Sequence, residues 1–292
     1  MTSPHILITG ANKGIGLALV AAVLEARDDA VVLLGSRSLS RGESAREGLI
    51  ASEPAWAERV VVVQLDVGDD DSVRAAARAV AERCAPGALY GIVNNAGVGF
   101  GELTAREVLN VNARGPRRVC EAFASLLAAD GRVVNVSSAA GPSFIAGCSP
   151  ARKKALTDPE VTWDAVESQM AEFLAVHEAG GDLDAAGFAD SVYGLSKACL
   201  NAYTMELARA WPKRTVNACT PGFIETDMTR GFATSRGVTP ADVGMKPPKE
   251  GTRAPMHLLF GEPGGSGWYF GSDAVRSPID RYRSPGDPPY TP

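Results

Sequence analysis

A glycine-rich turn near the N-terminus reads Thr9-Gly10-Ala11-Asn12-Lys13-Gly14-Ile15-Gly16. The apolar run at 6–8 precedes this turn, and a helix-like apolar stretch at 17–26 follows it. A strand, a glycine turn and a helix in this order form the context in which such glycines bind phosphate. There Gly10 permits the tight turn, Gly14 lets the backbone approach a pyrophosphate, and Gly16 lets the helix pack closely on the sheet. The turn predicts a phosphate site at a helix N-terminus, with a plain surface turn as the alternative.

The alternation of strand and helix continues along the chain. Apolar or β-branched segments that predict strands lie at 31–34, 60–65, 90–93, 131–136 and 216–220, with helical segments between them. Continuous apolar runs of this kind are typical of parallel strands that are buried on both faces. The pattern therefore predicts an α/β protein with a doubly wound Rossmann fold, in which helices flank a central parallel sheet.

The end of the second expected strand carries Ser36 and Arg37. In dinucleotide-binding folds an acid at this place accepts the ribose hydroxyls of NAD, whereas a cation accommodates the additional phosphate of NADP. No acid occurs between residues 30 and 42, and Lys13 adds a second cation within the glycine turn. A solvated surface arginine would explain Arg37 alone, but the combination favours NADP.

The composition argues against several other classes of protein. The 292 residues include 29 basic and 34 acidic side chains, and the net charge of −5 gives no reason to expect a nucleic-acid partner. No apolar stretch is long enough for a transmembrane helix, and residues 1–5 lack the basic start of a signal peptide. Five scattered cysteines fit a reducing, cytoplasmic location, and three distant histidines give no reason to expect a metal site.

Small and polar residues follow several of the expected strands. Asn94-Asn95-Ala96-Gly97 follows the strand at 90–93, and Ser137-Ser138 closes the strand at 131–136. Asn112 is expected at the start of a helix that runs towards Leu127. Tyr193 and Lys197 lie four positions apart in a helix that extends to about Trp211, so they share one face. Each feature alone is common, because a serine pair usually only caps a helix and a Tyr/Lys pair often arises by chance.

Together these features resemble the short-chain dehydrogenase/reductase family. The matching features, in the family's order, are the turn at 9–16, Asp66, the cluster at 94–97, Asn112, Ser138, Tyr193-x-x-x-Lys197 and Pro221-Gly222-x-x-x-Thr226. The resemblance spans residues 6 to about 228. Within the family the chain looks most like the monomeric NADPH-dependent carbonyl reductases. These share the amino-acid sequence of the glycine turn and a long insert between the serine and the tyrosine. Here 55 positions separate Ser138 from Tyr193.

The resemblance implies a catalytic set formed by Asn112, Ser138, Tyr193 and Lys197. Tyr193 would protonate the substrate, with its pKa lowered from about 10 by Lys197 and the nicotinamide cation. Lys197 would hold the nicotinamide ribose, Ser138 would bind the carbonyl oxygen, and Asn112 would support a water that relays protons. The expected cofactor-binding residues are Gly10, Asn12, Lys13, Gly14, Ile15, Gly16, Ser36, Arg37, Asp66, Val67, Asn94, Ala96, Gly97, Tyr193, Lys197, Pro221, Gly222, Ile224 and Thr226.

The function that this resemblance implies is NADPH-dependent reduction of ketone, quinone or aldehyde carbonyls to alcohols. One alternative is a biosynthetic alcohol dehydrogenase for a single terpenoid, alkaloid or polyketide ketone. A second alternative is a non-catalytic redox sensor that binds NADP(H), against which the intact catalytic set weighs. The spacing of 18 positions from Asn94 to Asn112 is shorter than usual in the family, so the substrate preference stays open.

Two segments lie outside the shared motifs, within what we expect to be a single catalytic domain over residues 1–292. The insert at 143–190 is expected to be helical: Ser149-Pro150 begins a helix, and another ends at Gly180-Gly181. Its apolar face consists of Trp163, Val166, Met170, Phe173, Leu174 and His177. In the resembled reductases this insert covers the face that other members use to dimerise, so a monomer is expected. The proline-rich tail at 261–292 is expected to pack as irregular extended chain and then fray.

Overall fold

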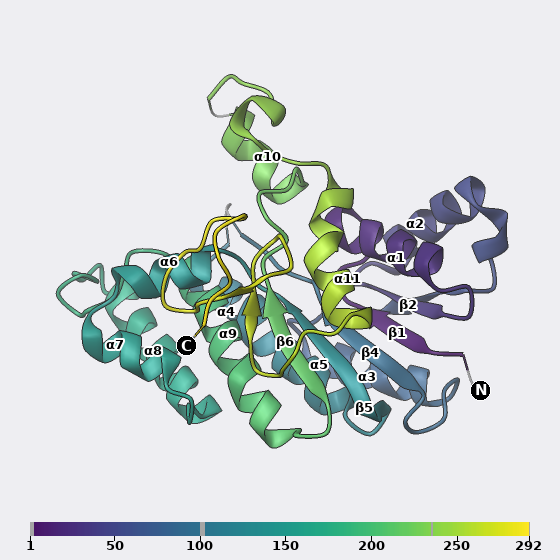
Figure 1. Ribbon diagram of the computed structural model, residues 1–292, viewed down its shortest axis with the longest axis horizontal. Coiled ribbons are helices and arrows are strands. Elements are labelled where there is room, and N and C mark those ends of the chain that lie inside the picture. The colour runs from purple at the N-terminus through teal and green to yellow at the C-terminus, as the bar shows by residue number, and fades with distance from the viewer. Residues whose placement is uncertain (1–2, 100–102, 235, 292) are drawn as a thin grey trace.

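The computed structural model describes residues 3–99, 103–234 and 236–291 (Figure 1). Its strands are β1 His5–Ile8, β2 Val31–Ser36, β3 Val60–Gln64, β4 Leu89–Asn94, β5 Leu127–Val136, β6 Thr215–Cys219, β7 Tyr269–Phe270 and β8 Arg276–Ser277. Its α-helices are α1 Gly14–Ala26, α2 Leu39–Ser52, α3 Asp70–Ala81, α4 Ala105–Leu109, α5 Gly115–Phe123, α6 Ala140–Gly147, α7 Pro150–Thr157, α8 Trp163–Glu178, α9 Val192–Ala210, α10 Asp227–Thr234 and α11 Arg253–Phe260. Shorter turns are η1 Pro54–Trp56, η2 Asn110–Arg114, η3 Ala241–Val243 and η4 Pro248–Thr252.

The strands form one sheet in the order β3-β2-β1-β4-β5-β6-β7-β8. Neighbouring strands are parallel throughout, except that β8 runs antiparallel to β7. The predicted doubly wound sheet is thereby confirmed. The strand order reverses direction between β1 and β4, which is the place where open parallel sheets of this kind bind ligands at their carboxyl edge.

Two hydrophobic cores lie on opposite faces of the sheet, and β1 shows how its residues divide between them. Leu7 joins the core formed with α3, α5 and α9, whereas Ile6 and Ile8 join the core formed with α1 and α11. All three side chains are fully buried. This division follows from the two-residue period of a strand, and it explains why the strand segments are apolar at successive positions.

The helix around Asn112 differs from the prediction. It begins at Ala105 with a capping box, in which the Thr104 N–H donates to Glu107 Oε2 (2.8 Å) and the Glu107 N–H donates to Thr104 Oγ1 (3.3 Å). Asn112 lies in the π-helical turn η2, in the middle of the helical segment. The helix also ends before Leu127, because that residue pairs with Leu89 in the sheet. The prediction was therefore wrong at both ends of this helix.

The insert is helical and covers α9 (Figure 1). Ser149 caps α7 by accepting a hydrogen bond from the Arg152 N–H, and α8 ends at Glu178, just before the two glycines, as predicted. The expected apolar face is buried, apart from His177, which is exposed. Trp163 meets the ring of Tyr203 on α9 edge-on, with 5.5 Å between centroids. The insert is thus part of the core on that side of the sheet.

The C-terminal tail does not fray within the described residues, contrary to the prediction. Strands β7 and β8 extend the sheet, and the Tyr290 N–H donates to the Arg276 carbonyl at 3.1 Å. The tail is also fastened by a buried ion pair between Arg283 and Asp273. The free energy of these contacts offsets the loss of chain entropy that would otherwise favour a frayed end.

Candidate active site

The glycine turn has the geometry that phosphate binding requires. Gly10 and Gly14 adopt positive φ angles of 62° and 56°. A Cβ atom at Gly10 would lie 2.8 Å from Ala96 Cα, and one at Gly16 would lie 2.4 Å from the Gly10 carbonyl oxygen, so larger residues are excluded at both positions. Helix α1 begins directly after Lys13 with no side-chain cap and no acid in its first turn. Its first N–H groups are therefore available to an anion.

The two expected phosphate cations lie in different surroundings. Arg37 is exposed at the end of β2, and within the described part of the chain it has no hydrogen-bond or ion-pair partner. Lys13 is exposed too, but its Nζ contacts Asp227 Oδ2 at 2.7 Å. Ser36 is buried, and its hydroxyl donates to the Ser38 carbonyl at 2.8 Å. Arg37 is thus the cation that is most ready to receive a phosphate.

Further along this edge, the strand-end residues differ in how they can reach a ligand. Asp66 is half-buried, and its Oδ1 accepts a hydrogen bond from the Gly68 N–H at 2.9 Å, whereas Val67 is buried. The Asn94 side chain points into the interior, where its Nδ2 donates to Asn135 Oδ1 at 2.8 Å. Any contact between Asn94 and a cofactor therefore has to come from the main chain.

Thr9 joins the glycine turn to the loop at 94–97. Its Oγ1 accepts hydrogen bonds from the N–H groups of Asn95 (3.0 Å) and Ala96 (2.9 Å). In return Asn95 Nδ2 donates to the carbonyls of Thr9 and Gly10. Thr9 and Asn95 were quoted in the motifs but not predicted as site residues. The sequence shows a hydroxyl directly after β1 and an amide directly after β4, but these two strands become neighbours only in the folded sheet.

Ser138 and Tyr193 meet at the end of β5. Ser138 Oγ accepts a hydrogen bond from the Ala140 N–H at 3.1 Å and also contacts the Tyr193 phenol. Burial raises the pKa of Tyr193, and the hydrogen bond with Ser138 opposes this rise only in part. The net shift in the protein alone is therefore upward, whereas the predicted lowering included the charge of the nicotinamide cation. It leaves Tyr193 protonated near neutral pH in the protein alone.

Lys197 is buried beneath Tyr193. Its Nζ donates to the Val136 carbonyl at 3.0 Å and lies 5.7 Å from the centre of the Tyr193 ring. The ammonium therefore lies over the face of the Tyr193 ring. Burial itself lowers the pKa of Lys197 to about 8.

Asn112 is held beside Lys197 by the turn η2. Its Oδ1 accepts from the Val98 N–H (2.9 Å), and its Nδ2 donates to the Val98 carbonyl (2.7 Å) and to Ser196 Oγ (3.1 Å). A Cβ atom at Gly97 would lie 3.4 Å from Asn112 Oδ1 and 3.6 Å from Lys197 Nζ. Asn112 thus fixes the loop next to Lys197. A π-turn at such a place is frequent in functional sites. Residues 100–102 of the shortened loop lie outside the described residues.

The loop after β6 closes the site from the side of the glycine turn. Gly222 has a φ of 93°, and its N–H donates to Thr220 Oγ1 at 3.2 Å. Ile224 is buried, and the Thr226 side chain faces Gly14. Pro221 precedes Gly222 at the start of this loop, and Asn12 and Ile15 lie half-buried across from it in the turn. The structure therefore brings both ends of the expected cofactor-binding set together.

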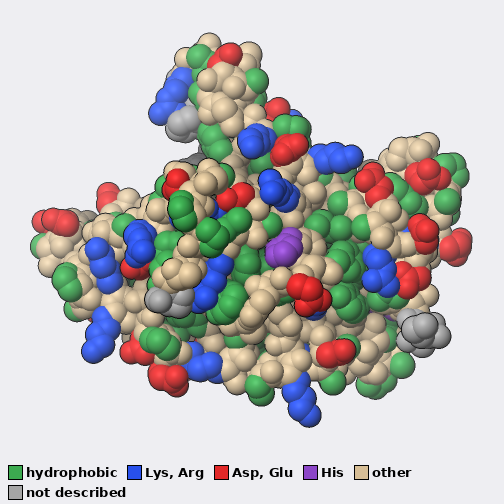
Figure 2. All heavy atoms as spheres, viewed as in Figure 1, with side chains coloured by type: hydrophobic (Ala, Val, Ile, Leu, Met, Phe, Trp, Pro, Cys, Tyr) green, Lys and Arg blue, Asp and Glu red, His purple; other side chains and the backbone are tan. Residues whose placement is uncertain are grey.

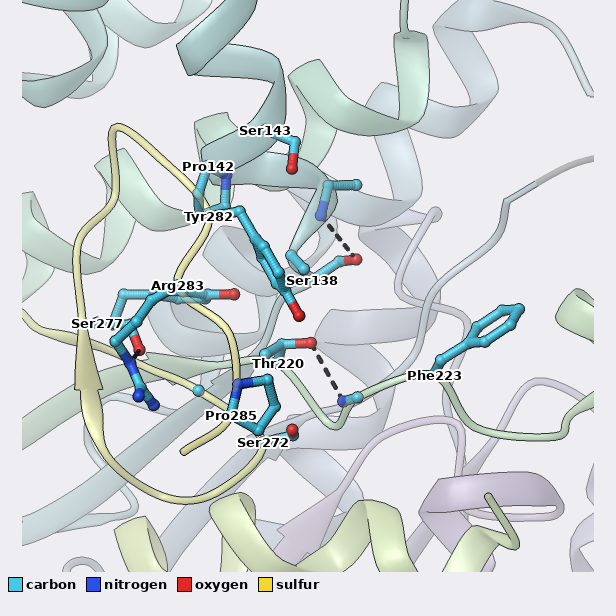
Figure 3. Close-up of a pocket in the computed structure, with 15 residues that line it drawn as sticks. Ser138, Pro142, Ser143, Thr220, Phe223, Ser272, Ser277, Tyr282, Arg283 and Pro285 are labelled. Atoms are coloured by element: carbon cyan, nitrogen blue, oxygen red, sulfur yellow. Dashed lines mark hydrogen bonds between the residues drawn. The ribbon is translucent and has the colours of Figure 1, made fainter. Parts of the chain in front are cut away.

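A cavity of about 340 Å³ opens beside Ser138 (Figure 3). Ser138 and Thr220 line it from the sheet, Phe223 from the loop after β6, and Tyr282 from the C-terminal tail. Figure 3 shows the Tyr282 hydroxyl directed into the cavity, on the side where Ser138 and Thr220 lie. The described residues contain no group of three or more His, Cys, Asp or Glu side chains that could hold a metal.

These residues fit a dinucleotide cofactor. The turn at 10–16 offers uncapped helix N–H groups with no room for larger side chains, and an unpaired arginine follows β2. A buried lysine and a tyrosine lie at the opposite end of the same edge, where the tyrosine contacts Ser138 of the cavity wall. The arrangement is suited to binding a phosphate-rich ligand along the edge and moving a proton at one end of it.

Comparison with known proteins identifies the family. A family model described as short chain dehydrogenase matches residues 4–157, more than half of the chain. The chain belongs to this family. Carbonyl reductase (NADPH) 1 of Homo sapiens is 30% identical over 276 residues, which cover 89% of this chain and 92% of that protein.

Two solved reductase structures are also similar to this chain. Menthone neomenthol reductase from Mentha piperita has a TM-score of 0.76 and 27% identity, over 93% of this chain and 99% of that one. Salutaridine reductase from Papaver somniferum has a TM-score of 0.76 and 27% identity, over 91% of this chain and 99% of that one.

Proposed function

We propose that the protein is an NADPH-dependent carbonyl reductase that converts ketone, quinone or aldehyde carbonyls to alcohols. The observation that carries this proposal is the contact between Ser138 and Tyr193 at the edge of a cavity, above a buried Lys197. Unpaired Arg37 supports NADPH, as do the names of the curated relatives. The proposal treats the chain as one NADP-binding catalytic domain over residues 1–292.

In this proposal the substrate carbonyl oxygen lies between the hydroxyls of Ser138 and Tyr193. Two donors at one oxygen stabilise the negative charge that develops there during reduction. Tyr193 then gives its proton to that oxygen, for which its protonated state near neutral pH suits it. Lys197 keeps a positive charge below the phenol and orients the ring face. The reduced nicotinamide supplies the hydride when it is bound.

The test follows NADPH absorbance with purified protein and a panel of quinones, isatin-like diketones, aldehydes and bulky cyclic ketones. Tyr193→Phe should bind NADPH nearly normally but lose almost all turnover, because only the proton donor is removed. Tyr290→Phe in the tail is the matched control, since the Tyr290 ring lies beside Arg276 and Arg281 instead of at Ser138. Turnover that survives Tyr193→Phe would contradict the mechanism.

A second candidate is a biosynthetic alcohol dehydrogenase for one specific terpenoid, alkaloid or polyketide ketone. The similarity to the Mentha and Papaver reductases supports it. The same panel separates the two, since a general reductase accepts several classes of carbonyl and a biosynthetic enzyme accepts one. A redox sensor without catalysis would bind NADPH and reduce none of the panel.

We further propose a small-molecule carbonyl substrate, a monomeric state and a cytoplasmic location, with no nucleic-acid or membrane partner. On the visible face in Figure 2, acidic and basic side chains are interspersed and form no broad basic patch. Within the described residues, none of the helices is long and apolar enough to cross a membrane. The five cysteines are buried free thiols, which is consistent with a reducing compartment.

A further inference from the structure

The C-terminal tail forms one wall of the cavity that Ser138 opens into. Tyr282, Arg283 and Pro285 of the tail line this cavity together with Ser138 (Figure 3). Tyr282 is 53% exposed, although it lies in a fastened segment. Phe223, on the loop after β6, is the other large exposed aromatic side chain that lines it. The tail therefore contributes an exposed aromatic ring and hydroxyl directly across from the proposed catalytic serine.

A buried ion pair holds this wall in place. Arg283 donates to Asp273 Oδ2 at 2.6 Å and to Ser277 Oγ at 2.8 Å, and the Gly286 N–H donates to Asp273 Oδ2 at 3.0 Å. The side chains of Arg283 and Asp273 are only 6% and 14% exposed. Burial alone would raise the pKa of Asp273, but the hydrogen bonds from Arg283 and Gly286 bring it below its ordinary value. The carboxylate stays charged, and the residues that flank Tyr282 stay anchored.

The same ion pair determines the charge of the cavity. Arg283 is the only charged residue among the described residues that line it, and Asp273 neutralises that charge. Seven of the fifteen lining residues carry a hydroxyl group. A cavity of about 340 Å³ is at the small end for ligand sites. These properties suit a neutral ketone of one or two rings that carries additional oxygen atoms.

We propose that Tyr282 is a specificity-determining residue, which donates a hydrogen bond to a second oxygen of a neutral ring ketone, and that Arg283 and Asp273 position it. This inference rests on the proposed carbonyl reduction, because the reacting carbonyl must be held at Ser138 and Tyr193. The Tyr282 hydroxyl, directed into the cavity, then meets the part of the ring farther from the reacting carbon. Ketones that lack a second oxygen leave this hydroxyl without a partner from the substrate.

The test compares 1-tetralone with 4-hydroxy-1-tetralone, in turnover and in binding by calorimetry. Tyr282→Phe should lower kcat/KM and affinity for the hydroxyketone about two- to tenfold more than for 1-tetralone, the range expected for one neutral hydrogen bond. Tyr290→Phe should change neither the ratio of kcat/KM values nor the ratio of affinities for the two ketones. Tyr290 belongs to the same tail but does not line the cavity.

The positioning role of Arg283 and Asp273 is tested with the same ratio of kcat/KM for the two ketones. Arg283→Met should reproduce the loss of selectivity seen with Tyr282→Phe, and Arg283→Lys should restore part of it, whereas a purely structural role would lower turnover of both ketones alike. Equal effects of Tyr282→Phe on both ketones, in turnover and in binding, would overturn the inference. If the wild type bound both ketones but reduced neither, the proposed function would fail, and the binding ratios would still decide the role of Tyr282.

Discussion

Arg37 after β2 and Lys13 in the glycine turn differ in what they already contact. This difference indicates which of the two side chains matters more for the choice between NADPH and NADH. Arg37 has no partner among the described residues, whereas Lys13 is shared with Asp227. An exposed ion pair is weak, so Lys13 can leave Asp227, but it must give up that contact to do so. Arg37 gives up no such contact. Of the two, we therefore expect Arg37 to contribute more to the preference for NADPH over NADH.

Arg37→Ala should weaken NADPH binding by about ten- to a hundredfold, since each hydrogen bond to a charged group contributes roughly 1.5–3 kcal/mol. Binding of NADH should barely change, because it has no 2′-phosphate. Lys13→Ala should act in the same direction but less strongly. The measurement is the dissociation constant of both cofactors by fluorescence titration. Similar losses for NADH and NADPH would show that Arg37 does not contact the phosphate.

Lys197 gives a prediction about pH. Burial lowers its pKa to about 8 from 10.5, so between these values the unfolded chain holds a proton that the folded protein has released. The contribution of Lys197 to the free energy of unfolding therefore rises with pH across this window. Lys197→Met removes it, so the variant should exceed the wild type in stability at pH 7, by up to about 3 kcal/mol. This advantage should shrink towards pH 10.

Urea unfolding of both proteins at pH 7, 8, 9 and 10 measures this difference. The pKa shifts of Cys199 and Tyr203 do not involve Lys197, so their effects cancel in the comparison. A stability difference that stays constant across the series would mean that the pKa of Lys197 is not lowered by folding.

Single residues also mark where prediction from sequence stops. The glycines at 10, 14 and 16 could be predicted, because their roles depend on the neighbouring strand and helix. The inward direction of Asn94 could not, since it depends on Asn135 in another strand. The raised pKa of Tyr193 in the protein alone could not be predicted either, since it depends on how deeply the folded chain buries the phenol.

At the scale of elements, strands were predicted better than helix ends and the tail. The strands β1 to β4 and β6 follow from continuous apolar runs, which reflect burial on both faces, whereas β5 begins at Leu127, before the predicted strand. The helix before Asn112 has a recognisable start in the sequence, the capping-box motif Thr104-x-x-Glu107, which the prediction of this helix did not include. The fastened tail has no comparable local signal, since Asp273 and Arg283 are ten positions apart in irregular chain and meet only after the tail folds back.

The insert is expected to contribute to stability through the packing of Trp163. Trp163 of α8 meets Tyr203 on α9 edge-on and lies under Arg117 of α5, with 4.9 Å from the guanidinium to its ring centre. Trp163→Ala should lower the free energy of unfolding by about 3–5 kcal/mol, because it leaves a cavity between these helices. The Trp163 ring does not line the active-site cavity, so kcat for a ketone should change little.

Urea unfolding measures this effect, with Lys154→Ala as control. Lys154 is an exposed residue of α7 in the same insert, and its loss should alter the free energy of unfolding by no more than about 0.5 kcal/mol. A similar small effect of Trp163→Ala would mean that the insert is not part of the cooperative core.

For the whole molecule, the insert determines which helices remain open to a second copy. Helix α8 packs on α9 and is joined by ion pairs to two segments before α5. Arg106 of α4 contacts Glu178 at 2.6 Å, and Arg114 of η2 contacts Glu167 at 2.8 Å. The second pair is the less exposed of the two, so it is screened less by solvent. We expect this cover over α9 to leave its surface unavailable to a second copy of the chain.

We therefore predict that the protein sediments as a monomer of about 30.5 kDa at micromolar concentration. Arg114→Glu should repel Glu167 and loosen α8 from the helices beneath it, because like charges would then replace the ion pair. The variant should be cut faster by protease near Gly180-Gly181 and should begin to self-associate, while Lys154→Glu on the exposed side of the insert should do neither. A stable wild-type tetramer would contradict the prediction and make the outer surface of the insert itself the interface. A wild-type monomer whose Arg114→Glu variant also stays monomeric and resists protease would mean that apolar contacts such as that of Trp163 hold the insert without this ion pair.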